Sequence, residues 1–315
     1  MHTEWIFDFS NPPHGSSEDR KKLLGGKGAG LAAMQSAGFQ VPPGFTLTTA
    51  CCQYVHQHQG AWPPGLEDEL AAALKRLESA TGRTFGQGAQ PLLVSVRSGA
   101  PVSMPGMMDT LLNCGLHPQL ADTLPNPADF WSRYLEFIDD FADTVHGIGE
   151  HKWSPTPDNP EAAVQQRLEE FARLTGSPFP TRPLEALKAC INAVFNSWNS
   201  ERAIAYRHHH GLNHLPGTAV NIQAMWPSHV SGITFTQDPN DVHADRLVIE
   251  AAFGLGEAVV SGEVTPDLFH LSRGDLSVTR RDIGFKRDVC PPLGAPPVKD
   301  PEAPSLSEAQ LRELA

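Results

Sequence analysis

The chain has 315 residues, of which 40% are hydrophobic and 19% are charged, and its formal net charge is −12. These values are typical of a soluble globular protein, and they argue against a nucleic-acid-binding face, which requires a basic surface. No apolar run approaches the roughly 18 residues of a membrane span, and no secretory signal is visible in the first residues. We therefore expect a cytoplasmic protein with two subdomains.

The first third of the chain is expected to mix helices with short strands. Turn residues, hydrophobic periodicity and β-branched runs predict these elements in chain order: a glycine-rich turn over 24–30 before a helix that ends near residue 38, a turn and strand over 41–49, a helix over 64–81, a buried strand over 91–97 and a loop over 98–109.

The middle of the chain predicts helices and the last third predicts strands. An aromatic stripe of helical period runs over 128–148, and further helices are expected over 161–175 and 183–206, all within a helical insertion around 111–200. Short strands are expected over 219–225, 232–236 and 246–250, and a proline-dense linker over 291–304 precedes a capping box formed by Ser305 and Glu308. We therefore expect an α+β fold with a first lobe over 1–218 and a sheet-rich second lobe over 219–315.

The cysteines and histidines do not indicate a metal site. The five cysteines form no C-x-x-C pair, so the sequence favours reduced thiols over a disulfide framework. The run His208–His210, with His214 nearby, has no carboxylate or cysteine at ligand spacing, and we interpret it as a solvated surface segment. No metal-ligating residue is assigned.

The glycine-rich turn carries one lysine, Lys27, just ahead of the apolar segment 31–34. Glycines let a backbone approach a ligand closely, and a following helix presents the positive end of its dipole, so the segment is a candidate polyphosphate site. It is not a Walker A loop, because no Ser or Thr follows the lysine. Alone, the segment fits a plain glycine-rich connection equally well.

Two further segments carry candidate ligand contacts. Arg97 stands at the end of a strand, and a guanidinium suits phosphate oxygens. In the segment that follows, Gly106 and Thr110 could offer a backbone N–H and a hydroxyl. Taken alone, however, the segment is better interpreted as a tight loop whose methionines fill the core. The segment 254–263 predicts either a turn close to a ligand or a hairpin-like turn.

Taken together, these motifs resemble one enzyme family over nearly the whole chain. Gly26-Lys27-Gly28-Ala29, followed by Val41-Pro42-Pro43-Gly44-Phe45, resembles the opening of pyruvate phosphate dikinase and phosphoenolpyruvate synthase. The segments 94–100, 103–110 and 197–203 look specifically like the dikinase. The segment 253–267 is closer to the synthase and to rifampicin phosphotransferase.

The resemblance implies an ATP-grasp nucleotide-binding domain that uses ATP and Mg²⁺. In that family the domain phosphorylates a carrier histidine on a separate domain, which passes the phosphoryl group to an acceptor such as pyruvate. Its residues carry over by motif in this order: Lys27 and Arg97 on the ATP phosphates, Gly106 and Thr110 lining the triphosphate, Gln223 at the adenine with the backbone near Met225 as a hinge, and Glu250 and Glu257 near the ribose or phosphates.

The sequence departs from the family near its C-terminus. The metal-binding acids and a glutamine of the family would fall after Ala315, and 268–315 contains no substitute. The carrier and acceptor domains are missing as well. We therefore expect the front portion of an ATP-grasp module: a shortened chain, a fragment of a longer ATP-dependent phosphotransferase, or a degenerate stand-alone protein, inactive by itself. The alternatives are the ATP-binding domain of a rifampicin-type phosphotransferase and a non-catalytic nucleotide-binding module.

Overall fold

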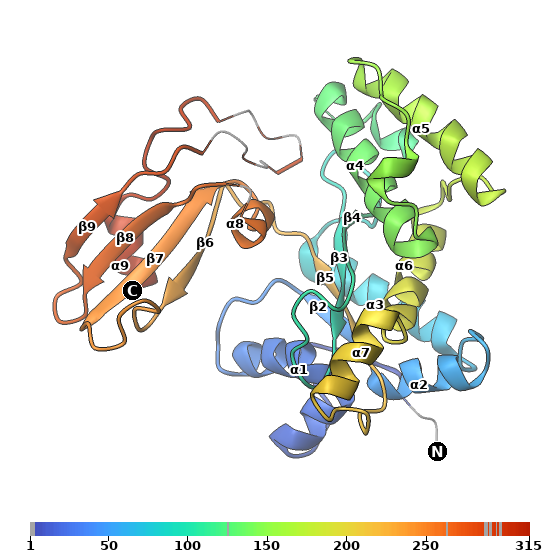
Figure 1. Cartoon of the computed structure of the whole chain (residues 1–315), viewed down its shortest axis with the longest axis horizontal. Helices are drawn as coiled ribbons and strands as arrows, with labels where there is room; N and C mark the ends of the chain where they lie inside the picture. Colours follow the sequence, from blue (N-terminus) through green and yellow to red (C-terminus); the bar gives the residue numbers. More distant parts are fainter. Residues whose placement is uncertain are drawn as a thin grey trace. The chain divides into compact units, whose positions relative to one another are not determined.

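The computed structural model describes residues 4–124, 126–262, 264–286, 289, 292–293, 295 and 298–315. The chain divides into two compact units, one that ends at Met225 and one that begins at Trp226 (Figure 1). Each unit combines helices with an antiparallel sheet of its own, which confirms the predicted α+β class. None of the helices in the described part of the chain combines the length and apolar character that a membrane crossing needs.

The first unit is built on a five-stranded sheet in which every neighbouring pair is antiparallel. Its strand order is β1-β2-β5-β3-β4. The strands are β1 (Ile6–Asp8), β2 (Gly44–Leu47), β3 (Val94–Gly99), β4 (Thr110–Cys114) and β5 (Ala219–Ala224). Because β5 pairs with β2 and β3, the first unit extends beyond the lobe boundary predicted after residue 218.

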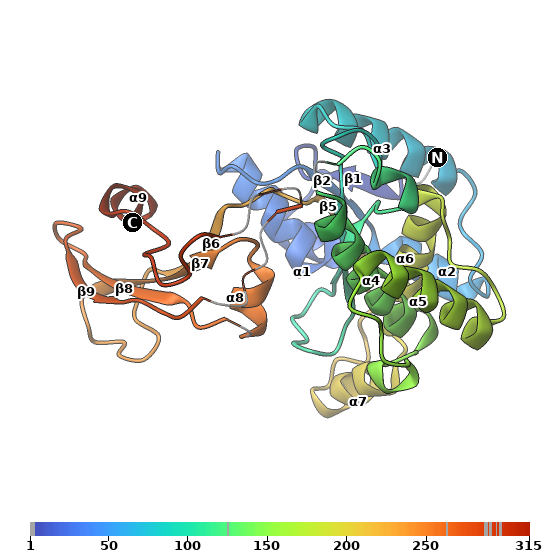
Figure 2. The same cartoon turned by 90° about the horizontal axis from the view of Figure 1, so that it is seen from above.

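The helices of the first unit lie around this sheet (Figures 1 and 2). They are α1 (Ser17–Ser36), α2 (Thr49–Gln57), α3 (Leu66–Thr81), α4 (Pro127–His146), α5 (Pro160–Thr175), α6 (Pro183–Ser197) and α7 (Glu201–His209), with short 3-10 helices at Pro118–Leu120 and Glu150–Lys152. α1 packs on β2, β3 and β5, and α6 packs on β3, β4 and β5. Both views show α1 and α6 on opposite sides of the strands.

The sheet has one apolar row that crosses four strands. Phe45, Ile222, Val96 and Leu111 are register partners in turn, and each is at most 1% exposed. Register partners share a face of a sheet, so this row forms a buried floor. The predicted aromatic stripe is a second core, in which α4 rings such as Phe137 pack on their counterparts from α5 and the following loop.

Two predicted elements of the middle segment differ from the structure. The first residues assigned to the helical insertion form β4, because they pair with β3 across the loop 100–109. The helix predicted over 183–206 is two helices. Ser200 separates them, since its side chain accepts a hydrogen bond from the Ala203 N–H and begins α7.

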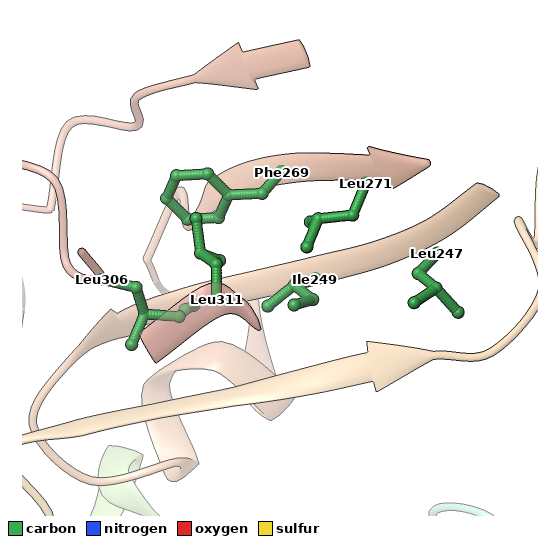
Figure 3. Close-up of a cluster of buried hydrophobic side chains, with 7 residues drawn as sticks. Leu247, Ile249, Phe269, Leu271, Leu306 and Leu311 are labelled. Atoms are coloured by element: carbon green, nitrogen blue, oxygen red, sulfur yellow. The ribbon is translucent and has the colours of Figure 1, made fainter. Parts of the chain in front are cut away.

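The second unit is a four-stranded antiparallel meander with the order β6-β7-β8-β9. Its elements are β6 (Val230–Phe235), β7 (Arg246–Phe253), α8 (Glu257–Ser261), β8 (Asp267–Ser272), β9 (Val278–Asp282) and α9 (Glu308–Leu314). Alternate positions of β7 and β8 face α9 and form the core of this unit (Figure 3). Leu311 of α9 is fully buried against Ile249 and Phe269.

The capping box of the last helix lies two residues after the predicted one. Ser307 and Gln310 cap α9 reciprocally, whereas Ser305 is buried. Both the N–H and the hydroxyl of Ser305 donate to the Asp267 carboxylate, at 2.6 and 2.7 Å. The Lys286 ammonium lies 2.5 Å from the same carboxylate, and both side chains of that pair are fully buried. Ser305 is therefore part of a buried polar network and not of the helix cap.

The thiols and histidines lie as the sequence suggested where they are described. Cys51, Cys52, Cys114 and Cys190 are free and buried, and Cys290 lies outside the described residues. The histidines of the run 208–210 are exposed, as is His214.

Candidate functional site

A polar row crosses the sheet of the first unit beside the apolar one. Thr46 on β2 is the register partner of Asn221 on β5, Asn221 of Arg97 on β3, and Arg97 of Thr110 on β4. These four side chains therefore share one face of the sheet. Gln223 lies two residues beyond Asn221 and belongs to the same face. The structure thus brings together Arg97, Thr110 and Gln223, which come from three distant segments of the sequence.

The predicted glycine-rich turn is a kink inside α1. The helix begins earlier than expected, at Ser17, but Gly25 has non-helical angles of φ 70° and ψ 172° and divides the helix in two. A Cβ at Gly25 would fall 1.5 Å from the Gly99 carbonyl oxygen, and the Gly26 N–H donates to the Ala100 carbonyl at 2.9 Å. Only glycine permits this contact, so the start of the second half of α1 rests on the end of β3.

Lys27 lies in the first turn of that second half, close enough to Arg97 for their charges to interact. Lys27 is exposed, but the protein around its ammonium group displaces part of the water there and lowers the pKa of Lys27 to about 8. The positive charge of Arg97 adds to the shift. Among the described residues, neither cation forms an ion pair with a carboxylate. Two adjacent cations without an anion favour a negatively charged ligand.

Arg97 is half-buried, and part of its guanidinium is unused. Its Nε atom is buried and has no hydrogen-bond partner in the part of the chain that the structure describes. Buried donors are almost always paired in native proteins, and an unpaired one at a candidate site points to a group that binds there. Arg97 therefore has donor capacity for an oxygen-rich ligand.

Thr110 belongs to this polar row, whereas Gly106 lies in the loop 100–109 before it. Thr110 is exposed at the start of β4, opposite Arg97. Gly106 is exposed with φ +70°, and a Cβ there would meet nothing within 4 Å. The loop is held at its end by Asp109, whose carboxylate lies 2.5 Å from the Arg202 guanidinium of α7. Burial raises the pKa of Asp109, and the arginine opposes that shift.

Gln223 and Met225 lie at the point where the chain leaves the first unit. The Gln223 side-chain amide donates to the Pro42 carbonyl at 3.1 Å, and Ser95 and Gly44 are its register partners. The Met225 N–H donates to the Leu93 carbonyl at 2.8 Å. The Met225 N–H is therefore already hydrogen-bonded and is not free to donate to a ligand at this end of the strand.

The two acidic candidates belong to the second unit. Glu250 is half-buried on β7, with Ile233 and Leu268 as register partners. Glu257 is the exposed first residue of α8, and the segment before it turns at Gly254, which has φ +87°. Their predicted closeness to the nucleotide stays a prediction.

Sequence reasoning assigned no role to Asn221 and Thr46. Both are at most 1% exposed although both are polar, and the Thr46 hydroxyl donates to the Asn221 side-chain carbonyl at 2.9 Å. The only signal in the sequence is the alternation in 219–224, where Asn221 and Gln223 interrupt an apolar strand at a spacing of two.

Comparison with known proteins identifies the family. A family profile described as pyruvate phosphate dikinase, AMP/ATP-binding domain, matches residues 21–80 and 58–315. The chain belongs to this family. It is 37% identical over 290 residues to a pyruvate, phosphate dikinase of Rhizobium meliloti, 41% over 298 residues to one of Giardia intestinalis, and 35% over 287 residues to a chloroplastic one of Flaveria pringlei.

These alignments cover 83–84% of the chain but only 30–34% of each relative. The chain thus spans about a third of the length of the dikinases that it matches. The dikinase resemblance of the sequence is confirmed, and the two alignment blocks of the family profile include all of the predicted site residues.

The described residues give less support for metal binding than for nucleotide binding. They contain no group of three or more His, Cys, Asp or Glu side chains placed to hold a metal ion. Asp109, the acid at the end of the loop 100–109, is engaged by Arg202. We derive no step through a protein-bound metal.

Proposed function

We propose that the polar face of the first sheet and the kink of α1 bind the phosphates of ATP through Lys27 and Arg97. The observation that carries this proposal is the adjacent pair of cations, in which loss of water and mutual repulsion lower the pKa of Lys27 to about 8. Phosphate oxygens would neutralise both charges and would give the unpartnered Arg97 Nε an acceptor. The membership in a family of AMP/ATP-binding domains supports ATP as the ligand.

We propose further contacts for an ATP molecule whose phosphates lie at Lys27 and Arg97. Thr110, opposite Arg97, offers a hydroxyl to the triphosphate, and the loop with Gly106 offers backbone N–H groups. Gln223 and the backbone near Met225 are proposed to hold the adenine. Because the Met225 N–H is engaged by Leu93, this contact would use other backbone groups of the hinge. Glu250 and Glu257 of the second unit are proposed for the ribose or the phosphates.

The proposed chemistry is transfer of a phosphoryl group to a carrier histidine on another domain, with pyruvate as the later acceptor. Phosphoryl transfer needs positioning and neutralisation of charge more than covalent help from the protein. Lys27 and Arg97 supply that neutralisation from this chain, and we expect Mg²⁺ to arrive with ATP, held by its phosphate oxygens. The names of the relatives support a dikinase over a rifampicin-type phosphotransferase.

A cytoplasmic location is part of the proposal. The four buried thiols fit a reducing compartment. Several relatives, among them the one of Flaveria pringlei, are named as chloroplastic, which makes a reducing organelle the alternative.

Calorimetric titration with ATP and Mg²⁺ tests the proposal. Wild type is expected to bind, and the double variant Lys27→Ala/Arg97→Ala to bind at least about tenfold more weakly, since a hydrogen bond to a charged group contributes about 1.5–3 kcal/mol. Lys22→Ala is the matched control, because Lys22 is an exposed lysine of the same helix that pairs with Glu18. Equal binding by wild type and the double variant would refute the proposed phosphate site.

A further inference from the structure

Asn221 is a fully buried polar residue at the centre of the polar row. It is 0% exposed and lies between Thr46 and Arg97 in the register of the sheet. Its Oδ1 atom accepts a hydrogen bond from the Thr46 hydroxyl at 2.9 Å. Its Nδ2 atom is buried and has no hydrogen-bond partner among the described residues. A half-satisfied buried amide costs stability, so its presence requires a reason other than stability.

Two glycines lie against the two ends of this amide. A Cβ at Gly28 of α1 would fall 2.7 Å from the Asn221 Oδ1, and a Cβ at Gly99 of β3 would fall 2.4 Å from the Asn221 Nδ2. Neither glycine has a positive φ, so glycine is required at both positions by the lack of space for a side chain and not by the backbone conformation. The Asn221 amide therefore fills the gap between the kinked start of α1 and the end of β3.

Each of these glycines adjoins a segment that carries a cation. Gly28 follows Lys27 directly, and Gly99 lies two residues after Arg97 on the same strand. We propose that Asn221 is a positioning residue: its amide sets the separation between Lys27 and Arg97 that matches the phosphates of a nucleotide. The proposal rests on the proposed function, and it adds a residue that itself contacts no phosphate.

Asparagine suits this position better than the smaller alanine or the longer glutamine. Alanine would leave the Thr46 hydroxyl without its acceptor and would open a space between α1 and β3, while glutamine would be too long for a gap that admits no extra methyl group. If Asn221 served only to satisfy Thr46, its loss would lower stability without changing the surroundings of Lys27. This difference separates a positioning role from a merely structural one.

The test measures the pKa of Lys27 by NMR of ¹³C-labelled lysine, with the signal assigned through Lys27→Arg, in wild type, Asn221→Ala and Asn192→Ala. Asn192 is a matched control: it lies on α6 of the same unit, and its side-chain carbonyl accepts a hydrogen bond from the Trp62 indole at 2.6 Å. In Asn221→Ala the start of α1 should loosen from β3. The pKa of Lys27 should then rise by about one unit toward its ordinary value, and ATP affinity should fall about tenfold. Asn192→Ala should change neither quantity.

A second pair of variants keeps the inference testable if Asn221→Ala folds poorly. Gly99→Ala drives a methyl group against the Asn221 amide, whose Nδ2 would lie 2.4 Å away, while the next nearest atom among the described residues lies 3.6 Å away. It should raise the pKa of Lys27 as Asn221→Ala does. Adding Asn221→Ala to Gly99→Ala should bring the pKa back toward the wild-type value, because the methyl group then occupies the vacated space.

An unchanged Lys27 pKa in Asn221→Ala, or strictly additive effects of Asn221→Ala and Gly99→Ala, would overturn the positioning role, even if stability falls. Absence of ATP binding by wild type would refute the proposed function, while the Lys27 titration, which needs no ligand, would still decide the role of Asn221.

Discussion

Replacing Gly25 with alanine should damage the first unit, because this glycine is where the kink of α1 touches β3. An L-residue at its φ of 70° costs about 1–2 kcal/mol. The new methyl carbon would lie 1.5 Å from the Gly99 oxygen, whereas an ordinary C···O contact needs about 3.3 Å or more. α1 would have to move away from β3, which breaks the hydrogen bond from Gly26 to Ala100.

The magnitude follows from these parts. Overpacking costs about 1–3 kcal/mol and a lost hydrogen bond about 0.5–1.5 kcal/mol, so with the backbone strain we expect Gly25→Ala to lose about 3–6 kcal/mol of unfolding free energy. Since domains are stable by only about 5–15 kcal/mol, this loss removes a large part of the stability of the first unit. Urea denaturation followed by tryptophan fluorescence reports on this unit, because all tryptophans except Trp226 belong to it.

Gly30→Ala is the matched control on the same helix. A Cβ at Gly30 would meet nothing within 4 Å, and a helical glycine replaced by alanine gains about 0.5–1 kcal/mol. Gly25→Ala should therefore lower the unfolding free energy, and Gly30→Ala should raise it. If Gly25→Ala stays within about 0.5 kcal/mol of wild type, the tight contact of α1 on β3 is refuted.

Three further predictions concern other groups. ATP affinity should be constant below pH 8 and fall about 10- to 100-fold as the pH rises through about 8, because Lys27 loses its charge there, and Lys27→Arg should abolish this fall in a calorimetric pH series. Tyr134→Phe should raise the unfolding free energy by about 1 kcal/mol, since the buried hydroxyl has no hydrogen-bond partner among the described residues; a loss above 1 kcal/mol in urea denaturation would reveal one. Lys286→Met should lower the unfolding free energy of the second unit by about 3–5 kcal/mol, because it leaves Asp267 buried without its cation. Lys299→Met, at an exposed position, should be neutral. Equal effects of the two variants in calorimetric melting would contradict the role of the Lys286–Asp267 pair.

The sequence predicts the parts of this fold that depend on local periodicity. The helix Leu66–Thr81, predicted over 64–81, and the strand that carries Arg97 follow from spacing that is visible within ten residues. Pairing across the chain is different. That Asn221 lies between Thr46 and Arg97 depends on contacts over more than a hundred residues, which no local pattern reveals.

The same limit explains the errors. The sequence predicts a capping box at Ser305 because Glu308 stands three residues later. In the structure Ser305 donates to the buried Asp267 carboxylate instead, and Ser307 with Gln310 caps the helix. For the candidate site, the motifs identified Lys27 and Arg97, and the structure brings their charges together. The place of Asn221 between the segments of Lys27 and Arg97 is seen only in the structure, where its amide lies against Gly28 and Gly99.

The most direct test of the central claim is a crystal structure of this chain with a non-hydrolysable ATP analogue and Mg²⁺. The account predicts triphosphate oxygens within hydrogen-bond distance of the Lys27 ammonium and the Arg97 guanidinium, with the Thr110 hydroxyl beside them. An analogue bound elsewhere, with Lys27 and Arg97 turned to solvent, would contradict it.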